Sequence, residues 1–190
     1  MDFSNHKKII FFGSSFTNEK RKGIIQFVDA LKQLQELIVS SGSSDGNILI
    51  VIAGNKPESS GIFSGIPFDI HFMGYINDDE KLSMIYQAAD VFVCTSIQDS
   101  GPMMINEAIM CGTPVVSFEI GVVNDLVLNG ESGFKIPIGG DVKLMAQKIF
   151  SILEMSECDF NKMVKSTYDI GLKRTSNKIF ATNFLEAVTE

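Results

Sequence analysis

Cysteine is scarce in this chain, and the few cysteines follow no pattern that would hold a metal ion or a disulfide framework. The three, Cys94, Cys111 and Cys158, have no metal-ligand spacing, and their odd number suits a reducing compartment. Also absent are an apolar run long enough to span a bilayer and, at the N-terminus, the order of a signal peptide. These absences predict a cytoplasmic protein.

Positive charge is also in short supply. The 190 residues include 16 Lys and Arg against 23 Asp and Glu, a net charge of −7, and the basic residues are scattered. This balance argues against a long basic face for nucleic acid, whereas a local phosphate pocket remains compatible with it. The sequence has neither a Walker loop nor a Gly-x-Gly-x-x-Gly dinucleotide fingerprint.

What the chain does contain is an alternation of strand and helix patterns over a length typical of one domain. This alternation predicts an α/β fold, a Rossmann-like doubly wound parallel sheet of about six strands with helices on both faces. We expect a single domain of residues 1–190 in which 156–190 form a helical tail. Strands are expected at 8–15, 47–54, 68–74, 90–96, 114–119 and 134–138, and helices at 22–39, 77–89, 102–111, 141–155, 159–172 and 176–188, with a short helix within 121–133.

Helix-capping residues mark several of these boundaries. Asn77 with Glu80 forms a capping-box-like pair, Asp141 caps a later helix, and Gly112 ends the helix that begins near Pro102. The polar run Asn77 to Glu80 also suggests a metal site, but capping explains it and no second ligand cluster exists. His71, within a predicted strand, is better explained as structural than as catalytic.

The strongest functional signal lies between two predicted strands, where seven residues separate Asp99 from Glu107. The acids flank the start of a helix at the carboxyl end of a strand, where open α/β sheets bind ligands. Glu107 interrupts an apolar helix, and a carboxylate buried there needs a partner. Both acids are suited to accept hydrogen bonds from sugar hydroxyls. The plainer alternatives are that Asp99 is a turn or cap residue and that Glu107 pairs with a lysine.

A second candidate site follows the first predicted strand. A small-residue loop beginning at Gly13 leads to the basic run Lys20-Arg21-Lys22 and then to Gly23 at the start of a helix. A strand that runs into such a loop and a helix N-terminus is a general anion site, and lysines can reach a phosphate as point charges. The alternative is a solvated basic turn.

Four blocks of sequence carry a family likeness. They are FFGSSFTNEKRKGI, IHFMGYINDDEKLSMIYQAADVFVCTS, QDSGPMMINEAIMCGTPVVSF and NDLVLNGESGFKIP. Together they resemble the C-terminal, donor-binding half of group 1 (family 4) retaining glycosyltransferases of the GT-B fold, from Lys8 to about the last helix. The third block is the most specific, because it is similar to the family's Glu-(seven residues)-Glu motif followed by Ala-x-x-x-Gly-x-Pro-Val-Val.

The resemblance implies roles for the matching residues. Glu107 is expected to hold the ribose hydroxyls of a nucleotide-sugar, Asp99 to lie near the hydroxyls of the transferred sugar, and Lys22 to neutralise the diphosphate. The other expected donor-binding residues are Gly13 and Ser14 in the first loop, Tyr75 and Ile76 at the base pocket, and Ser100, Gly101, Pro102 and Met103, whose backbone supports the sugar and diphosphate.

Some positions depart from the family pattern. Ser14 stands where an Arg is common, so its share of phosphate binding falls to Lys22, to its basic neighbours or to backbone. Asp99 replaces Glu, Pro102 replaces an aromatic residue or Gly, and Gly121-Val122 replaces Gly-Gly. The family's N-terminal domain, which binds acceptor and supplies the usual catalytic histidine, has no counterpart here. We therefore expect a donor-binding half that is inactive alone.

The implied reaction transfers a sugar, of hexosyl type, from a nucleoside diphosphate to a saccharide or lipid-linked acceptor with retention, in surface polysaccharide synthesis. The resemblance implies no metal and no other cofactor, the missing acceptor domain as partner, no nucleic acid, and peripheral contact of the full enzyme with the inner membrane face. Two alternatives remain open: a non-catalytic nucleotide-sugar-binding module, and a GT-B-type nucleotide-sugar epimerase.

Overall fold

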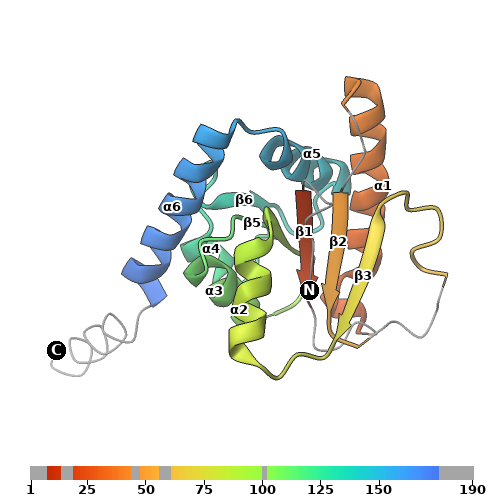
Figure 1. The fold of residues 1–190 in the computed structure, drawn as a ribbon. Helices are drawn as coiled ribbons and strands as arrows, with labels where there is room; N and C mark the ends of the chain where they lie inside the picture. Colours follow the sequence, from red (N-terminus) through yellow and green to blue (C-terminus); the bar gives the residue numbers. More distant parts are fainter. Residues whose placement is uncertain (1–7, 14–18, 44–47, 56–60, 100–101, 176–190) are drawn as a thin grey trace, which may run out of the picture.

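The fold is built on one six-stranded sheet in which every neighbouring pair of strands is parallel. The computed structural model describes residues 8–13, 19–43, 48–55, 61–99 and 102–175. The strands β1 (Lys8–Gly13), β2 (Ile48–Ala53), β3 (Asp69–Gly74), β4 (Val91–Cys94), β5 (Val115–Phe118) and β6 (Gly133–Ile136) lie in the order β3-β2-β1-β4-β5-β6 (Figure 1). The predicted Rossmann-like sheet is confirmed.

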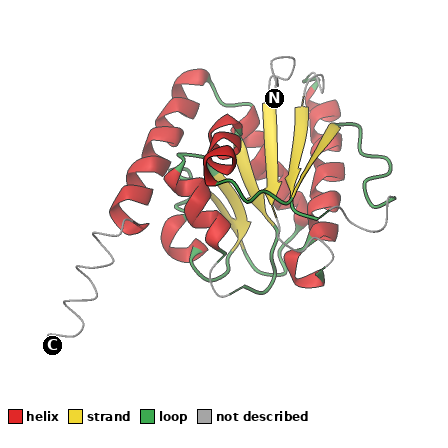
Figure 2. Cartoon of the chain, turned by 60° about the horizontal axis from the view of Figure 1, so that its bottom comes forward, coloured by secondary structure: helices red, strands yellow, loops and turns green. Residues whose placement is uncertain are grey.

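Helices cover both faces of this sheet, as predicted (Figure 2). One layer pairs α1 (Ile24–Ser41) with α5 (Val142–Leu153), and the other contains α2 (Asp79–Ala88), α3 (Met103–Met110) and α6 (Glu157–Thr175). A four-residue helix, α4 (Val123–Leu126), follows β5. Because both faces are covered, β2, β4 and β5 are buried along their whole length, which explains their nearly continuous apolar sequences.

The strand order reverses beside β1, whose two neighbours are β2 and β4. The connections from these strands leave in opposite directions, which opens a crevice at the carboxyl ends of β1 and β4. The predicted site segments follow these two strands: the basic run comes after β1, and Asp99 comes after β4. The topology therefore brings them to one edge of the sheet.

Two of the three predicted helix boundaries are as expected. Asp141 caps α5 by accepting a hydrogen bond from the Lys143 N–H, and Gly112, with a φ of +77°, follows the end of α3. The prediction of Asn77 as the cap of α2 is wrong, because the Asp78 carboxylate accepts from the Lys81 N–H at 3.0 Å. Either residue type caps well, so the sequence could not separate adjacent candidates.

The predicted helical tail is seen in part. Helix α6 runs over Glu157–Thr175, longer than the predicted 159–172, and packs on α3. The helix predicted at 176–188 lies outside the described residues. None of the described helices is long and apolar enough to cross a membrane.

Candidate functional site

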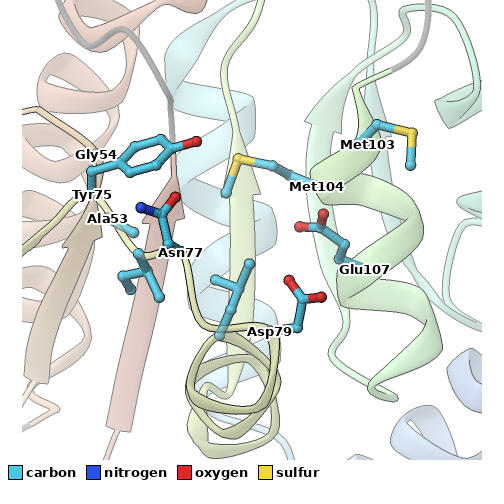
Figure 3. A pocket seen from close by; sticks show the side chains of 10 residues that line it. Ala53, Gly54, Tyr75, Asn77, Asp79, Met103, Met104 and Glu107 are labelled. Carbon is cyan, nitrogen blue, oxygen red and sulfur yellow. The ribbon is translucent and has the colours of Figure 1, made fainter.

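Three adjoining pockets follow the carboxyl edge of the sheet. The first, here called the Tyr75 pocket, has a volume of about 300 Å³ and lies beside the ends of β2 and β3 (Figure 3). The second, the Lys22 pocket, has about 310 Å³ and is lined by Gly13 of β1 and Cys94 of β4. The third, the Ile138 pocket, has about 660 Å³ and lies beyond β4, β5 and β6.

Shared side chains join these pockets into a row. Met103 and Met104 line both the Tyr75 pocket and the Lys22 pocket, and Arg21 and Asp99 line both the Lys22 pocket and the Ile138 pocket. The row follows the order of the strands across the sheet, so a long ligand can lie along the edge and contact all three.

Glu107 and Tyr75, two predicted site residues, meet in the Tyr75 pocket. Ile76 also lines it, and Tyr75 is 62% exposed as a residue. Figure 3 shows the Glu107 carboxylate turned into the pocket from α3, with the Met104 side chain between it and Tyr75. The pocket thus offers an exposed aromatic ring and an apolar wall on one side and a carboxylate on the other.

Tyr86 on α2 is the partner that the Glu107 carboxylate requires. Its hydroxyl donates a hydrogen bond to Glu107 Oε2 at 3.0 Å. The alternative of a lysine partner is wrong for the part of the chain that the structure describes, where no lysine pairs with Glu107. Burial, and then the charge of Glu107, raise the pKa of Tyr86 far above its ordinary value, so this hydroxyl stays protonated as a donor.

Asp99 and Lys22 form an ion pair in the Lys22 pocket. The Lys22 Nζ lies 2.7 Å from Asp99 Oδ2, and the two side chains are only 18% and 14% exposed. The Arg21 Nη1 lies 3.8 Å from the same carboxylate oxygen. The plainer alternative made Asp99 only a turn or cap residue. The ion pair shows that it also joins the loop after β4 to the basic turn after β1.

Two residues hold this basic turn in place: Gly23, which the sequence placed at the start of the helix, and Thr95, which sequence reasoning missed. The 3-10 turn η1 (Lys20–Lys22) ends at Gly23, whose φ is +71°. The Thr95 hydroxyl donates to the Gly23 carbonyl at 2.7 Å, and the Ile97 N–H donates to the Arg21 carbonyl at 2.8 Å. These two hydrogen bonds join the loop after β4 to the turn that carries Lys22. In the sequence, the pair Lys22-Gly23 was the signal that marked this turn.

Gly13 lies against the Met104 side chain. A Cβ at Gly13 would come within 1.8 Å of Met104 Cε, so the absence of a side chain there makes room for the thioether. Met104 consequently stands between the Tyr75 pocket and the Lys22 pocket. Methionine is unbranched and flexible, so this divider can change its rotamer.

The remaining predicted site residues have mixed outcomes. Pro102 is the N-cap of α3 and lines the Lys22 pocket with Met103. Ser14, Ser100 and Gly101 lie outside the described residues. Gly121, the first residue of the Gly121-Val122 pair that stands in place of the family's Gly-Gly, lines the Ile138 pocket. Within the described ranges, no group of three or more His, Cys, Asp or Glu is placed to hold a metal ion.

A family model and a curated relative each match most of this chain. The family described as "Glycosyl transferases group 1" matches residues 2–168. The chain is 28% identical over 148 residues to phosphatidyl-myo-inositol mannosyltransferase from Mycobacterium leprae (strain TN), an alignment that covers 77% of this chain and 37% of that protein.

Solved structures share the fold. Sucrose-phosphate synthase from Thermosynechococcus elongatus superposes with a TM-score of 0.75 at 20% identity, over 100% of this chain and 46% of that one. Anabaena HepE, solved in complex with UDP-glucose, superposes with a TM-score of 0.73 at 20% identity, over 98% and 50%. The chain thus spans between about a third and a half of the length of these relatives.

Proposed function

This chain belongs to the family of group 1 glycosyl transferases, and from that premise we propose that its three pockets bind a nucleoside-diphosphate sugar whose sugar is transferred to an acceptor hydroxyl. One observation carries the proposal: a carboxylate beside an apolar wall, a basic turn and a second carboxylate follow one another along the sheet edge. This order matches that of nucleoside, diphosphate and sugar in such a donor.

The nucleoside is assigned to the Tyr75 pocket. Tyr75 and Ile76 offer apolar surface to the base, and Glu107 accepts hydrogen bonds from the ribose hydroxyls. HepE, whose structure was solved with UDP-glucose, supports a nucleotide-sugar ligand.

The diphosphate is assigned to the Lys22 pocket, where Lys22, Arg21 and the N-terminus of α3 supply positive charge. A phosphate that enters this pocket competes with Asp99 for the Lys22 ammonium group, since the two side chains are paired at 2.7 Å. Asp99, which also lines the Ile138 pocket, would then accept a hydrogen bond from the sugar in place of the bond from Lys22. Ligand binding would therefore replace the ion pair between Lys22 and Asp99 with an ion pair between Lys22 and the phosphate.

The chemistry follows from where charge develops. As the bond between sugar and diphosphate breaks, negative charge grows on the leaving phosphate, and Lys22 is placed to stabilise it. We propose retention at the anomeric carbon, a hexosyl-type sugar, and a saccharide or lipid-linked acceptor used in surface polysaccharide synthesis. The residues proposed here hold the donor, and a second domain would hold the acceptor and the catalytic histidine.

Replacing Lys22 by methionine tests this assignment. Lys22→Met is expected to weaken binding of UDP or GDP about tenfold or more, because a charge-assisted hydrogen bond contributes about 1.5 to 3 kcal/mol. The matched control is Lys32→Met, which removes a lysine that pairs with Asp29 at 3.2 Å on the exposed face of α1. Titration calorimetry measures both. No binding of either nucleotide by the unaltered chain, or unchanged affinity in Lys22→Met, would contradict the proposed function.

A further inference from the structure

Tyr86 is a buried side chain whose one polar side-chain atom is aimed at the candidate site. The residue is 1% exposed, and its ring packs edge-on against Phe11 and Phe92 at centroid distances of 4.9 and 5.4 Å. Its backbone carbonyl accepts a hydrogen bond from the Thr113 hydroxyl at 2.7 Å. Packing and backbone together fix the position of the phenol oxygen, so its neighbour Glu107 must adapt to it.

We propose that Tyr86 is a positioning residue that orients the Glu107 carboxylate and thereby lets the site distinguish ribose from deoxyribose. This inference rests on the proposed function. The observation that supports it is a hydrogen bond between two helices: the Tyr86 hydroxyl on α2 donates to Glu107 Oε2 on α3 at 3.0 Å. Among the residues that the structure describes, Tyr86 is the one recorded hydrogen-bond donor to this carboxylate.

The effect on Glu107 is a loss of rotational freedom. A glutamate side chain has several rotatable bonds, and ordering it costs free energy that ligand binding would otherwise have to supply. With one oxygen held by Tyr86, the carboxylate has a fixed direction, and Figure 3 shows it turned into the Tyr75 pocket. The site is thus arranged before the ligand arrives.

A carboxylate carries hydrogen-bond acceptors only, so Glu107 selects ligand groups that donate. The bond from the Tyr86 hydroxyl occupies one acceptor site on Oε2 and leaves the others for the ligand. The two neighbouring hydroxyls of a ribose provide two donors at the spacing of a carboxylate, and a 2′-deoxyribose provides one fewer. The chemical class selected is therefore a ribonucleotide.

Tyr86→Phe tests the inference, because it removes the hydroxyl and keeps the ring. We expect the unaltered chain to bind UDP about tenfold more tightly than 2′-deoxy-UDP, as suits one charge-assisted hydrogen bond. In Tyr86→Phe this ratio should fall to about two, because UDP, which makes two hydrogen bonds to Glu107, should lose more affinity than 2′-deoxy-UDP, which makes one. The matched control is Tyr168→Phe on α6, a residue that is 45% exposed. GDP and its 2′-deoxy form are measured in parallel.

Each outcome is decisive. A ratio that Tyr86→Phe leaves unchanged overturns the inference. If the affinities for both nucleotides fall by the same factor, the ratio is unchanged and the role of Tyr86 is purely structural. If the unaltered chain binds neither ribonucleotide, the proposed function itself fails. Should Tyr86→Phe not fold, proton NMR of the unaltered chain replaces it: a slowly exchanging Tyr86 hydroxyl proton should shift on adding UDP and shift less with 2′-deoxy-UDP. No difference between the two nucleotides overturns the inference.

Discussion

Glu107→Gln is expected to weaken binding of a nucleoside diphosphate by about tenfold to a hundredfold, since hydrogen bonds to a charged group contribute about 1.5 to 3 kcal/mol. The substitution keeps the volume of the side chain and leaves an amide oxygen to accept from Tyr86. It removes the negative charge and places an amide N–H₂ where a ribose hydroxyl needs an acceptor. Titration calorimetry with UDP and GDP measures the loss.

Glutamine is preferable to alanine at this position. Glu107→Ala would leave the buried Tyr86 hydroxyl without its partner, at a cost of about 1 to 3 kcal/mol in folding stability. The matched control is Asp79→Asn, which neutralises another acid that lines the same pocket. If Glu107→Gln and the unaltered chain bind UDP and GDP with equal affinity, Glu107 does not bind the ribose hydroxyls.

Gly23→Ala is expected to be the most damaging single substitution in the basic turn. Gly23 has a φ of +71°, and an added Cβ would lie 1.8 Å from the Thr95 carbonyl oxygen, a backbone atom that cannot simply rotate away. The left-handed conformation costs an alanine roughly 1 to 2 kcal/mol, and displacement of Thr95 adds to this. Because Thr95 bonds to the turn that carries Lys22, nucleotide affinity should fall as well.

Gly42→Ala is the matched control for this substitution. Gly42 has the same φ of +71° at the end of α1, and an added Cβ would meet nothing within 4 Å. Urea unfolding should therefore show Gly23→Ala to be less stable than Gly42→Ala by about 2 kcal/mol or more, the range of overpacking at a well-packed position. Two variants of equal stability would show that the close approach to Thr95 is unimportant.

The fold was open to prediction because its signals are local. Apolar runs such as that of β2 and the spacing of α1 follow from burial on both faces of a parallel sheet. The errors were local too, since Asp78 rather than Asn77 caps α2. Both side chains are good caps, and the choice between neighbours depends on backbone angles that a sequence does not display.

The site was open to prediction only in part. The sequence indicated that Glu107 needs a partner, but the partner is a tyrosine on another helix, 21 residues away. The Lys22 and Asp99 ion pair joins residues 77 positions apart. Both contacts depend on how α2, α3 and the strand-end loops meet in three dimensions. The roles that the family resemblance implies for the site residues stay predictions, and Ser14, Ser100 and Gly101 lie outside the described ranges.

NMR mapping of a bound nucleotide-sugar tests most directly whether one donor molecule spans the three pockets. Amide resonances of the ¹⁵N-labelled chain are followed during titration with UDP-glucose, with GDP-mannose as a parallel. We predict that residues of the Tyr75 pocket, the Lys22 pocket and the Ile138 pocket, among them Ile76, Lys22 and Gly121, shift together along one binding curve. Shifts confined to one pocket, or no shift with either donor, would contradict the account.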